Sequence, residues 1–216
     1  MRINPNNNIA TIEGDQTHAK WIEEAGTLVH DNWLTRGLVP HVHGLKTILD
    51  LGANIGTLTE FFLQRAENVV AVEANPAAVE CLRHNCPEAR VVHAAVSAAP
   101  DRRVHMVHCV DNPGASFCAL GGDIKTVTVD TLDVKPDFIK LDIEGWEAAA
   151  LHGAERTLRE CRPKILCEVN HPALVRQGSS RWELFHLLDK AGYTWTIIQP
   201  DCKYDDEQYD ILAEAR

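Results

Sequence analysis

Two carboxylates follow a short apolar run in a pattern that suits acid–base chemistry. The run 138–141 (FIKL) is followed by Asp142 and Glu144, and Gly145 stands where the next segment begins. In extended backbone, side chains two residues apart point to the same side, so both carboxylates would share one face. One could then orient a donor or an acceptor while the other removes a proton from a hydroxyl. Alternatively, Glu144 caps the positive end of the following helix.

A second apolar run, 164–169 (KILCEV), carries Glu168 near its end, and His171 follows shortly after it. If the two runs are parallel strands of one sheet, their carboxyl ends meet at one edge, where open α/β sheets bind ligands. We therefore take Asp142, Glu144, Glu168 and His171 as candidate catalytic residues. His171 is a candidate general base because the ordinary pKa of histidine is about 6.5. The alternative is an exposed loop histidine.

The same four groups could also hold a divalent ion, because hard cations bind carboxylate oxygens. The sequence has no local ligand spacing such as His-x-x-x-His to support such a site. We therefore predict that no metal is bound.

A glycine-rich turn follows the first buried run, 47–51 (TILDL). Its spacing is Asp-x-Gly-x-x-x-Gly, formed by Asp50, Gly52 and Gly56. Gly52 would allow a tight turn and a close approach to a ligand, and Gly56 would let the next helix pack near the strand. The dinucleotide fingerprint Gly-x-Gly-x-x-Gly has glycine where Asn54 stands, so we expect no pyrophosphate cradle. Asp50 would instead suit a cationic amino group.

Glu73 ends the second run, 69–73 (VVAVE), about 20 residues after the turn, where an acid can accept both hydroxyls of a ribose. Together, the turn and this acid describe a nucleoside site. They suit S-adenosylmethionine, with Asp50 near the ammonium group and Ala95 and Val96 against the adenine. The alternative is a glycine-rich turn beside a solvated glutamate. The predicted cofactor-binding residues are Asp50, Gly52, Ala53, Asn54, Gly56, Glu73, Ala74, Ala95, Val96 and Asp142.

The chain resembles the FkbM family of S-adenosylmethionine-dependent methyltransferases. The resemblance rests on the segments 48–56 (ILDLGANIG), 72–76 (VEANP), 138–147 (FIKLDIEGWE), 151–154 (LHGA) and 165–171 (ILCEVNH). The Asp-x-Glu-Gly segment is its most distinctive part, since most methyltransferases of this fold share the glycine turn. The resemblance implies methyl transfer to a hydroxyl of a sugar or small metabolite.

An alternation of apolar runs with helical segments positions these residues. From residue 47 almost to the end, seven such runs alternate with helix-like segments, for example at 54–65, 145–161 and 179–191. This rhythm predicts an α/β fold built around a mostly parallel sheet, and the FkbM resemblance implies the Rossmann-like fold of class I methyltransferases. We expect a seven-stranded, mostly parallel sheet with its last strand antiparallel and helices on both faces. Residues 47–216 would form this domain, and residues 1–46 an N-terminal helical extension.

One region departs from this rhythm. The runs 104–108 and 125–129 alternate like antiparallel strands and are joined by a Gly/Asn/Pro-rich segment, so we expect an inserted hairpin. Asn112 and Ser116 lie in that segment and are candidate substrate contacts, since loops often carry acceptor contacts. The alternative for this segment is simple turn chemistry.

Composition and charge exclude several classes of protein. The apolar share is 45% and the charged share 24%, as in soluble globular chains. The net charge of 21 − 31 = −10 argues against a nucleic-acid partner. No apolar run is long enough to cross a membrane and no signal peptide is evident, so we expect a cytoplasmic protein. The seven cysteines show no Cys-x-x-Cys spacing and predict core packing rather than disulfides.

We therefore expect an S-adenosylmethionine-dependent O-methyltransferase with a small-molecule or glycan acceptor. Two alternatives remain open. One is a non-catalytic module of the same fold that binds S-adenosylmethionine or a nucleoside, because a fold does not prove an activity. The other is a nicotinamide-dependent oxidoreductase, which the missing dinucleotide fingerprint disfavours.

Overall fold

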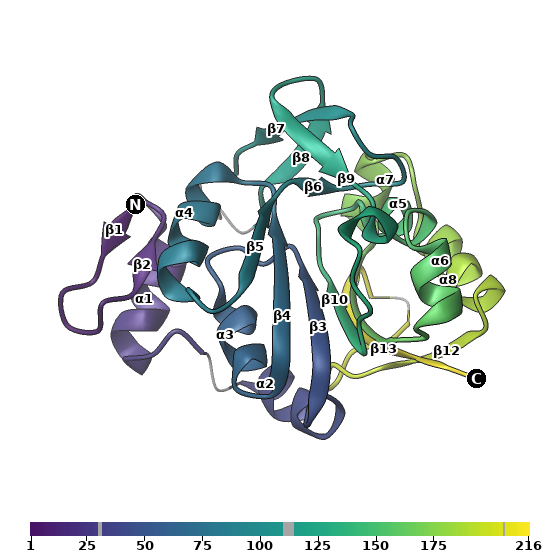
Figure 1. The fold of residues 1–216 in the computed structure, drawn as a ribbon, viewed down its shortest axis with the longest axis horizontal. Helices are drawn as coiled ribbons and strands as arrows, with labels where there is room; N and C mark the ends of the chain where they lie inside the picture. Colours follow the sequence, from purple (N-terminus) through teal and green to yellow (C-terminus); the bar gives the residue numbers. More distant parts are fainter. Residues whose placement is uncertain (30–31, 110–114, 205) are drawn as a thin grey trace.

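The computed structural model describes residues 1–29, 32–109, 115–204 and 206–216. A seven-stranded sheet with the order β12-β13-β11-β10-β3-β4-β5 forms its centre (Figure 1). The strands are β3 (Leu45–Leu51), β4 (Ala66–Glu73), β5 (Arg90–His93), β10 (Phe138–Leu141), β11 (Lys164–Asn170), β12 (Tyr193–Ile197) and β13 (Gln208–Ala215). Neighbouring strands are parallel, except that β13 runs antiparallel to β11 and β12. The predicted mostly parallel sheet with an antiparallel last strand is confirmed.

Helices cover both faces of this sheet. They are α1 (Gln16–Ala25), α2 (Trp33–Leu38), α3 (Thr57–Leu63), α4 (Pro76–Asn85), α5 (Glu147–His152), α6 (Glu155–Glu160), α7 (His171–Arg176) and α8 (Arg181–Lys190). Ile48 on β3 belongs to a core cluster with Phe61 and Phe62 of α3. Its neighbour Leu49 belongs to another cluster, with Leu151 of α5 and side chains of α6 and α8. Because alternate strand residues are buried on opposite faces, residues 48–51 of β3 are all buried, and Asp50 is the one charged residue among these four.

Two helical predictions needed correction. The single helix expected over 145–161 is divided into α5 and α6 at Gly153, where an added Cβ would lie 2.4 Å from the backbone oxygen of Ser97. This close packing of a neighbouring segment interrupts the helix. The segment after β11, expected to be a loop, forms α7, which begins at His171 itself. Asn170 caps α7, because its side chain accepts a hydrogen bond from the backbone N–H of Ala173.

A smaller sheet contains the predicted excursion. Its order is β6-β9-β7-β8, with β6 (Ala95–Val96), β7 (Arg103–Val107), β8 (Phe117–Leu120) and β9 (Ile124–Val127). The expected antiparallel pairing of β7 with β9 is confirmed. Strand β8 was not predicted, and it pairs with the other edge of β7. The candidate substrate residue Asn112 lies outside the described residues.

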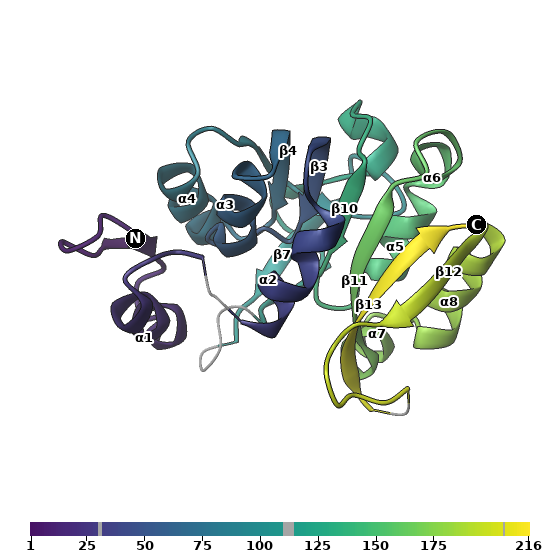
Figure 2. The same ribbon diagram turned by 90° about the horizontal axis from the view of Figure 1, so that it is seen from below.

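The first 46 residues are not purely helical. A short antiparallel pair, β1 (Arg2–Ile3) and β2 (Ala10–Thr11), precedes α1. The apolar spacing over 18–34 favours one covering helix, but the structure has two: α1 ends at Ala25, where Gly26 caps it in the left-handed conformation, and α2 begins at Trp33. Figure 2 shows α1 and this pair beside α3 and α4, at the end of the molecule away from the C terminus. Within the described ranges, no helix has the length and apolar character needed to cross a membrane.

Candidate active site

A cavity of about 210 Å³ opens at the carboxyl ends of β3, β4 and β10. This is the edge of the sheet where ligands of open α/β folds bind. Most predicted cofactor-binding and substrate residues line it. They are Gly52, Ala53, Asn54, Glu73, Ala74, Ala95, Val96, Ser116 and Asp142, and the catalytic candidate Glu144 lines the cavity with them. The structure therefore brings together residues that lie up to 92 positions apart in the chain.

The glycine turn shapes one wall of the cavity. Gly52 has φ +82°, and an added Cβ would lie only 1.8 Å from the backbone oxygen of Asp142. Its backbone N–H donates to the carbonyl oxygen of Val72 at 2.9 Å, which fixes the turn against β4. Only glycine leaves room for the crossing of the turn past the end of β10. Gly56 lies behind the turn, at the start of α3, and does not line the cavity.

Backbone donors hold the carboxylate of Glu73 in place. One oxygen accepts the N–H of Asn54 at 2.8 Å and the other accepts the N–H of Asn75 at 2.7 Å. Burial raises the pKa of Glu73, and the two backbone hydrogen bonds oppose that rise. A carboxylate oxygen can accept more than one hydrogen bond, so Glu73 keeps acceptor capacity toward the cavity.

Lys140 is a site residue that the sequence analysis missed. It lies on β10 beside Asp50 of β3, and its Nζ donates to the carbonyl oxygen of Gly52 at 2.7 Å. The same Nζ lies 3.6 Å from Asp50 Oδ1 and 3.4 Å from Asp142 Oδ2. Burial would lower the pKa of Lys140, but the negative charges of Asp142 and Asp50 outweigh burial and raise it. The sequence did offer one sign of this role, because Lys140 is the one charged residue in the apolar run 138–141.

Asp50 itself is fully buried and does not line the cavity. The hydroxyl of Thr59 on α3 donates to its Oδ2 at 2.7 Å, while Lys140 faces its Oδ1. Burial raises the pKa of Asp50, although the charge of Lys140 opposes the rise. The structure therefore does not place Asp50 where it could contact an amino group of the donor. Asp50 instead balances the charge of Lys140.

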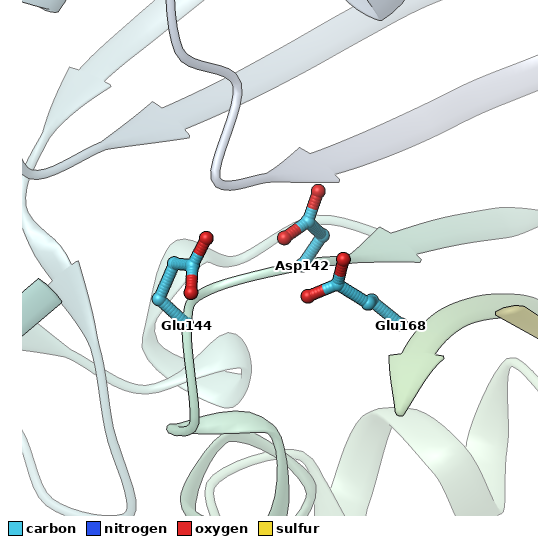
Figure 3. Close-up of side chains that lie close together, drawn as sticks. All are labelled: Asp142, Glu144 and Glu168. Atoms are coloured by element: carbon cyan, nitrogen blue, oxygen red, sulfur yellow. The ribbon is translucent and has the colours of Figure 1, made fainter. Parts of the chain in front are cut away.

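Three of the four candidate catalytic residues converge. One carboxylate oxygen each from Asp142, Glu144 and Glu168 lies within 4.8 Å of the others (Figure 3). Burial, followed by the charge of Asp142, raises the pKa of Glu144 to about 7. Burial and the charges of Asp142 and Glu144 raise the pKa of Glu168 well above its ordinary value. Burial and like charge therefore both disfavour the ionised forms of Glu144 and Glu168.

Two further carboxylates lie near this cluster. Glu147 is fully buried, and its Oε1 accepts the backbone N–H groups of Ile143 and Gly145 at 2.9 and 3.1 Å. It thus fixes the loop that carries Glu144. Asp210 lies on β13 opposite Glu168, and burial raises its pKa to about 7. No local spacing in the sequence connects Asp210 to the cluster, because β13 joins the sheet only through long-range pairing.

His171 and Glu168 do not line the cavity. The backbone N–H of His171 donates to the carbonyl oxygen of Glu207, and its Nδ1 is buried without a hydrogen-bond partner among the described residues. As the first residue of α7, His171 is thus not the exposed loop histidine of the alternative. Its role as a general base stays a prediction.

Side chains from outside the predicted set complete the wall. His18 and Trp21 of α1 line the cavity, so the N-terminal region contributes directly to the site. Phe117 on β8 and Trp146, which follows the acid-bearing loop, add aromatic surface. Trp146 is oriented by its ring N–H, which donates to the backbone oxygen of Cys118 at 3.2 Å.

One family model matches part of the chain. The family model for the methyltransferase FkbM domain matches residues 123–195, a segment that contains the Asp142–Glu144 loop and Glu168. The predicted resemblance to FkbM methyltransferases is confirmed. No curated protein matches the sequence.

Solved structures share the fold of this chain over most of its length. The methyltransferase FkbM from Methylobacillus flagellatus KT is 20% identical with a TM-score of 0.55, over 86% of this chain and 48% of its own. This chain therefore spans about half the length of that relative. A TehB-like SAM-dependent methyltransferase from Corynebacterium glutamicum has a TM-score of 0.58 at 11% identity, over 94% of this chain and 98% of its own.

A third structure carries a ligand. Magnesium protoporphyrin IX methyltransferase from Synechocystis PCC 6803, with bound SAH, has a TM-score of 0.53 at 11% identity, over 85% of this chain and 80% of its own. The fold is that of class I S-adenosylmethionine-dependent methyltransferases. Together with the FkbM domain match, this supports a methyltransferase of the S-adenosylmethionine-dependent kind.

Proposed function

We propose that the chain transfers a methyl group from S-adenosylmethionine to a hydroxyl of a sugar or other small metabolite. The observation that carries the proposal is the arrangement of the cavity. The rigidly held carboxylate of Glu73 and the glycine turn form one part of its wall, and the carboxylates of Asp142 and Glu144 form another. Such a cavity offers one place for a nucleoside and another for an acceptor.

The residues present fit the donor. The glycine turn at Gly52 lines the cavity, and Glu73 offers acceptors for ribose hydroxyls. Ala95 and Val96 give apolar surface for the adenine. When bound, S-adenosylmethionine supplies an electrophilic methyl group on a positively charged sulfur, and the acidic lining suits that positive charge.

The protein's own part in the reaction is to align the acceptor and to take its proton. Glu144 lines the cavity and has a pKa of about 7, so near neutral pH it is partly ionised and can accept a proton from a hydroxyl. Asp142, beside Lys140, keeps a neighbouring negative charge. Loss of the proton makes the acceptor oxygen a better nucleophile, and positioning contributes the rest.

The acceptor follows from the same lining. The acidic cavity and the net charge of −10 disfavour nucleic acid and favour a neutral or cationic small molecule or glycan. We prefer methyl transfer to a hydroxyl over methyl transfer to an amine because of the FkbM resemblance. Ser116 of the smaller sheet lines the cavity and is the proposed acceptor contact there.

The first test is calorimetric titration of the chain with S-adenosylmethionine and, separately, with NAD. We expect micromolar binding of the first and none of the second. Glu73→Gln should weaken binding of S-adenosylmethionine by about 1–3 kcal/mol, because the amide replaces a charged acceptor of hydrogen bonds. Circular dichroism checks that the variant folds. Glu67→Gln, on the exposed start of the same strand, is the matched control and should bind normally.

An acceptor screen with sugar hydroxyls follows. Turnover of one acceptor would support the O-methyltransferase. Binding of S-adenosylmethionine with no turnover of any acceptor class would favour the non-catalytic module. Binding of NAD instead would contradict the proposal.

A further inference from the structure

The three converging carboxylates have features that acid–base chemistry does not require. Asp142 and Glu144 come from the loop after β10, and Glu168 comes from β11, so two different segments bring them to within 4.8 Å. Like charges this close repel one another, and a structure that gathers them needs a compensating group. The side chains around the cluster compensate these charges only in part.

Each carboxylate is held from outside by one donor. Glu168 Oε1 accepts a hydrogen bond from the side-chain amide of Gln208 at 2.7 Å, and Glu144 Oε2 lies 3.9 Å from the guanidinium of Arg176. Asp142 Oδ2 faces the buried lysine of β10 at 3.4 Å. These contacts orient the three groups and use one oxygen of each, which leaves the other oxygen for a ligand.

An independent observation concerns Glu168. Its Oε2 is buried and has no hydrogen-bond partner in the described part of the chain. Figure 3 shows its carboxylate turned toward Asp142, with Glu144 on the other side. A buried acceptor oxygen without a donor is unfavourable, and one that points at other carboxylates cannot be satisfied by them while they are ionised. A cation bound between the three carboxylates would interact favourably with each of them, including the buried oxygen of Glu168.

We propose that Asp142, Glu144 and Glu168 bind a hard divalent cation beside the cavity. The spacing is compatible with one ion, because ligand oxygens around Ca²⁺ are about 3.3–3.7 Å apart at right angles and about 4.6–5.2 Å apart on opposite sides. Since the three oxygens all lie within 4.8 Å of one another, small side-chain adjustments would let them hold Ca²⁺, and a further contraction would let them hold Mg²⁺. This inference replaces the expectation from the sequence that no metal is bound.

The site also has a role that rests on the proposed function. Asp142 and Glu144 line the cavity whereas Glu168 lies behind them, so an ion between them would face the acceptor. The coordination positions not filled by protein would then take water or the acceptor hydroxyl. A hydroxyl bound to a divalent cation loses its proton more readily, and the proton would pass to water or to a neighbouring carboxylate.

The test measures ion binding without donor or acceptor. The full chain, freed of metal with a chelator, is titrated with Mn²⁺ and free Mn²⁺ is read by electron paramagnetic resonance. Ca²⁺ and Mg²⁺ are then added as competitors. We expect one saturable site per chain with a dissociation constant below about 1 mM. Glu168→Gln should weaken binding by at least about tenfold, as loss of a ligand would.

Two controls separate ligation from general negative charge. Asp210→Asn removes a neighbouring carboxylate that is not in the cluster, and it should weaken Mn²⁺ far less than Glu168→Gln does. Glu160→Gln, on the exposed face of α6, should change nothing. If Glu168→Gln does not fold, as judged by circular dichroism, Glu144→Gln carries the same expectation.

The outcomes distinguish this inference from the proposed function. Absence of saturable Mn²⁺ binding, or equal weakening by Glu168→Gln and Asp210→Asn, would overturn the metal site. Calorimetry with S-adenosylmethionine on the same metal-free samples tests the donor site separately. A chain that binds S-adenosylmethionine but no ion refutes the metal site alone, and a chain that binds one ion but no S-adenosylmethionine refutes the proposed donor alone.

Discussion

Replacing Lys140 by methionine tests the charge arrangement behind the cavity. In the native chain, Lys140 Nζ contacts the backbone oxygen of Gly52 and lies within 3.6 Å of Asp50, which is fully buried. Methionine keeps the length and apolar character of the side chain but removes the charge and the donor. The variant would leave a buried carboxylate uncompensated, which costs about 3–5 kcal/mol when that carboxylate is ionised.

The cost should depend on pH. Without Lys140, the pKa of Asp50 in the folded state rises further above its unfolded value of about 3.9. The folded state then binds the proton more tightly than the unfolded state, so stability is greatest at low pH and falls as pH rises toward the folded pKa. The slope is about 1.4 kcal/mol per pH unit in that range. We therefore expect a loss of about 3–5 kcal/mol near pH 8 and at least about 1 kcal/mol less near pH 5.5.

Urea denaturation at the two pH values measures this loss. Lys164→Met is the matched control, because Lys164 is also a strand lysine, and it pairs with Glu214 at 2.8 Å on the surface. It should cost at most about 1 kcal/mol at either pH. Asp50→Asn combined with Lys140→Met should remove the pH-dependent part. The reasoning is refuted if Lys140→Met costs the same at both pH values, or no more than the control.

Three further predictions concern the site. Gly52→Ala should abolish binding of S-adenosylmethionine in calorimetry, because its Cβ would meet the backbone of Asp142, whereas Gly37→Ala, with open space around its Cβ, should bind normally. Asp142→Asn should lower turnover by about 10²-fold or more, because proton transfer to Glu144 loses the negative charge beside it, while its urea midpoint changes little; normal turnover with the true acceptor would remove Asp142 from the mechanism. Measured without divalent ions, kcat should rise with pH through about 7, because the proposed base Glu144 must be ionised, and Glu144→Gln should eliminate that limb of the profile; an unchanged limb would assign it to another group.

Local patterns in the sequence determined the central sheet. The strands β3, β4, β10 and β11 are buried on both faces, so each is a short apolar run that can be recognised without knowing its neighbours. Their parallel order also brings the ends of the runs to one edge, which is why Glu73 and Asp142 could be placed at one cavity from the sequence. Gly52 could be recognised from the spacing Asp-x-Gly-x-x-x-Gly, since a tight turn with this backbone geometry requires glycine.

Only the tertiary structure decided the contacts between segments that are distant in sequence. Lys140 acquires its role from Asp50 on the neighbouring strand, and Asp210 reaches the carboxylate cluster through antiparallel pairing of the last strand. The break between α5 and α6 results from close packing against the backbone of Ser97, and β8 is specified by its pairing with β7. None of these contacts can be predicted from the local secondary-structure propensities of the residues. The sequence thus determined which residues could do chemistry, and the packing of the sheet decided which of them share one site and with what charge.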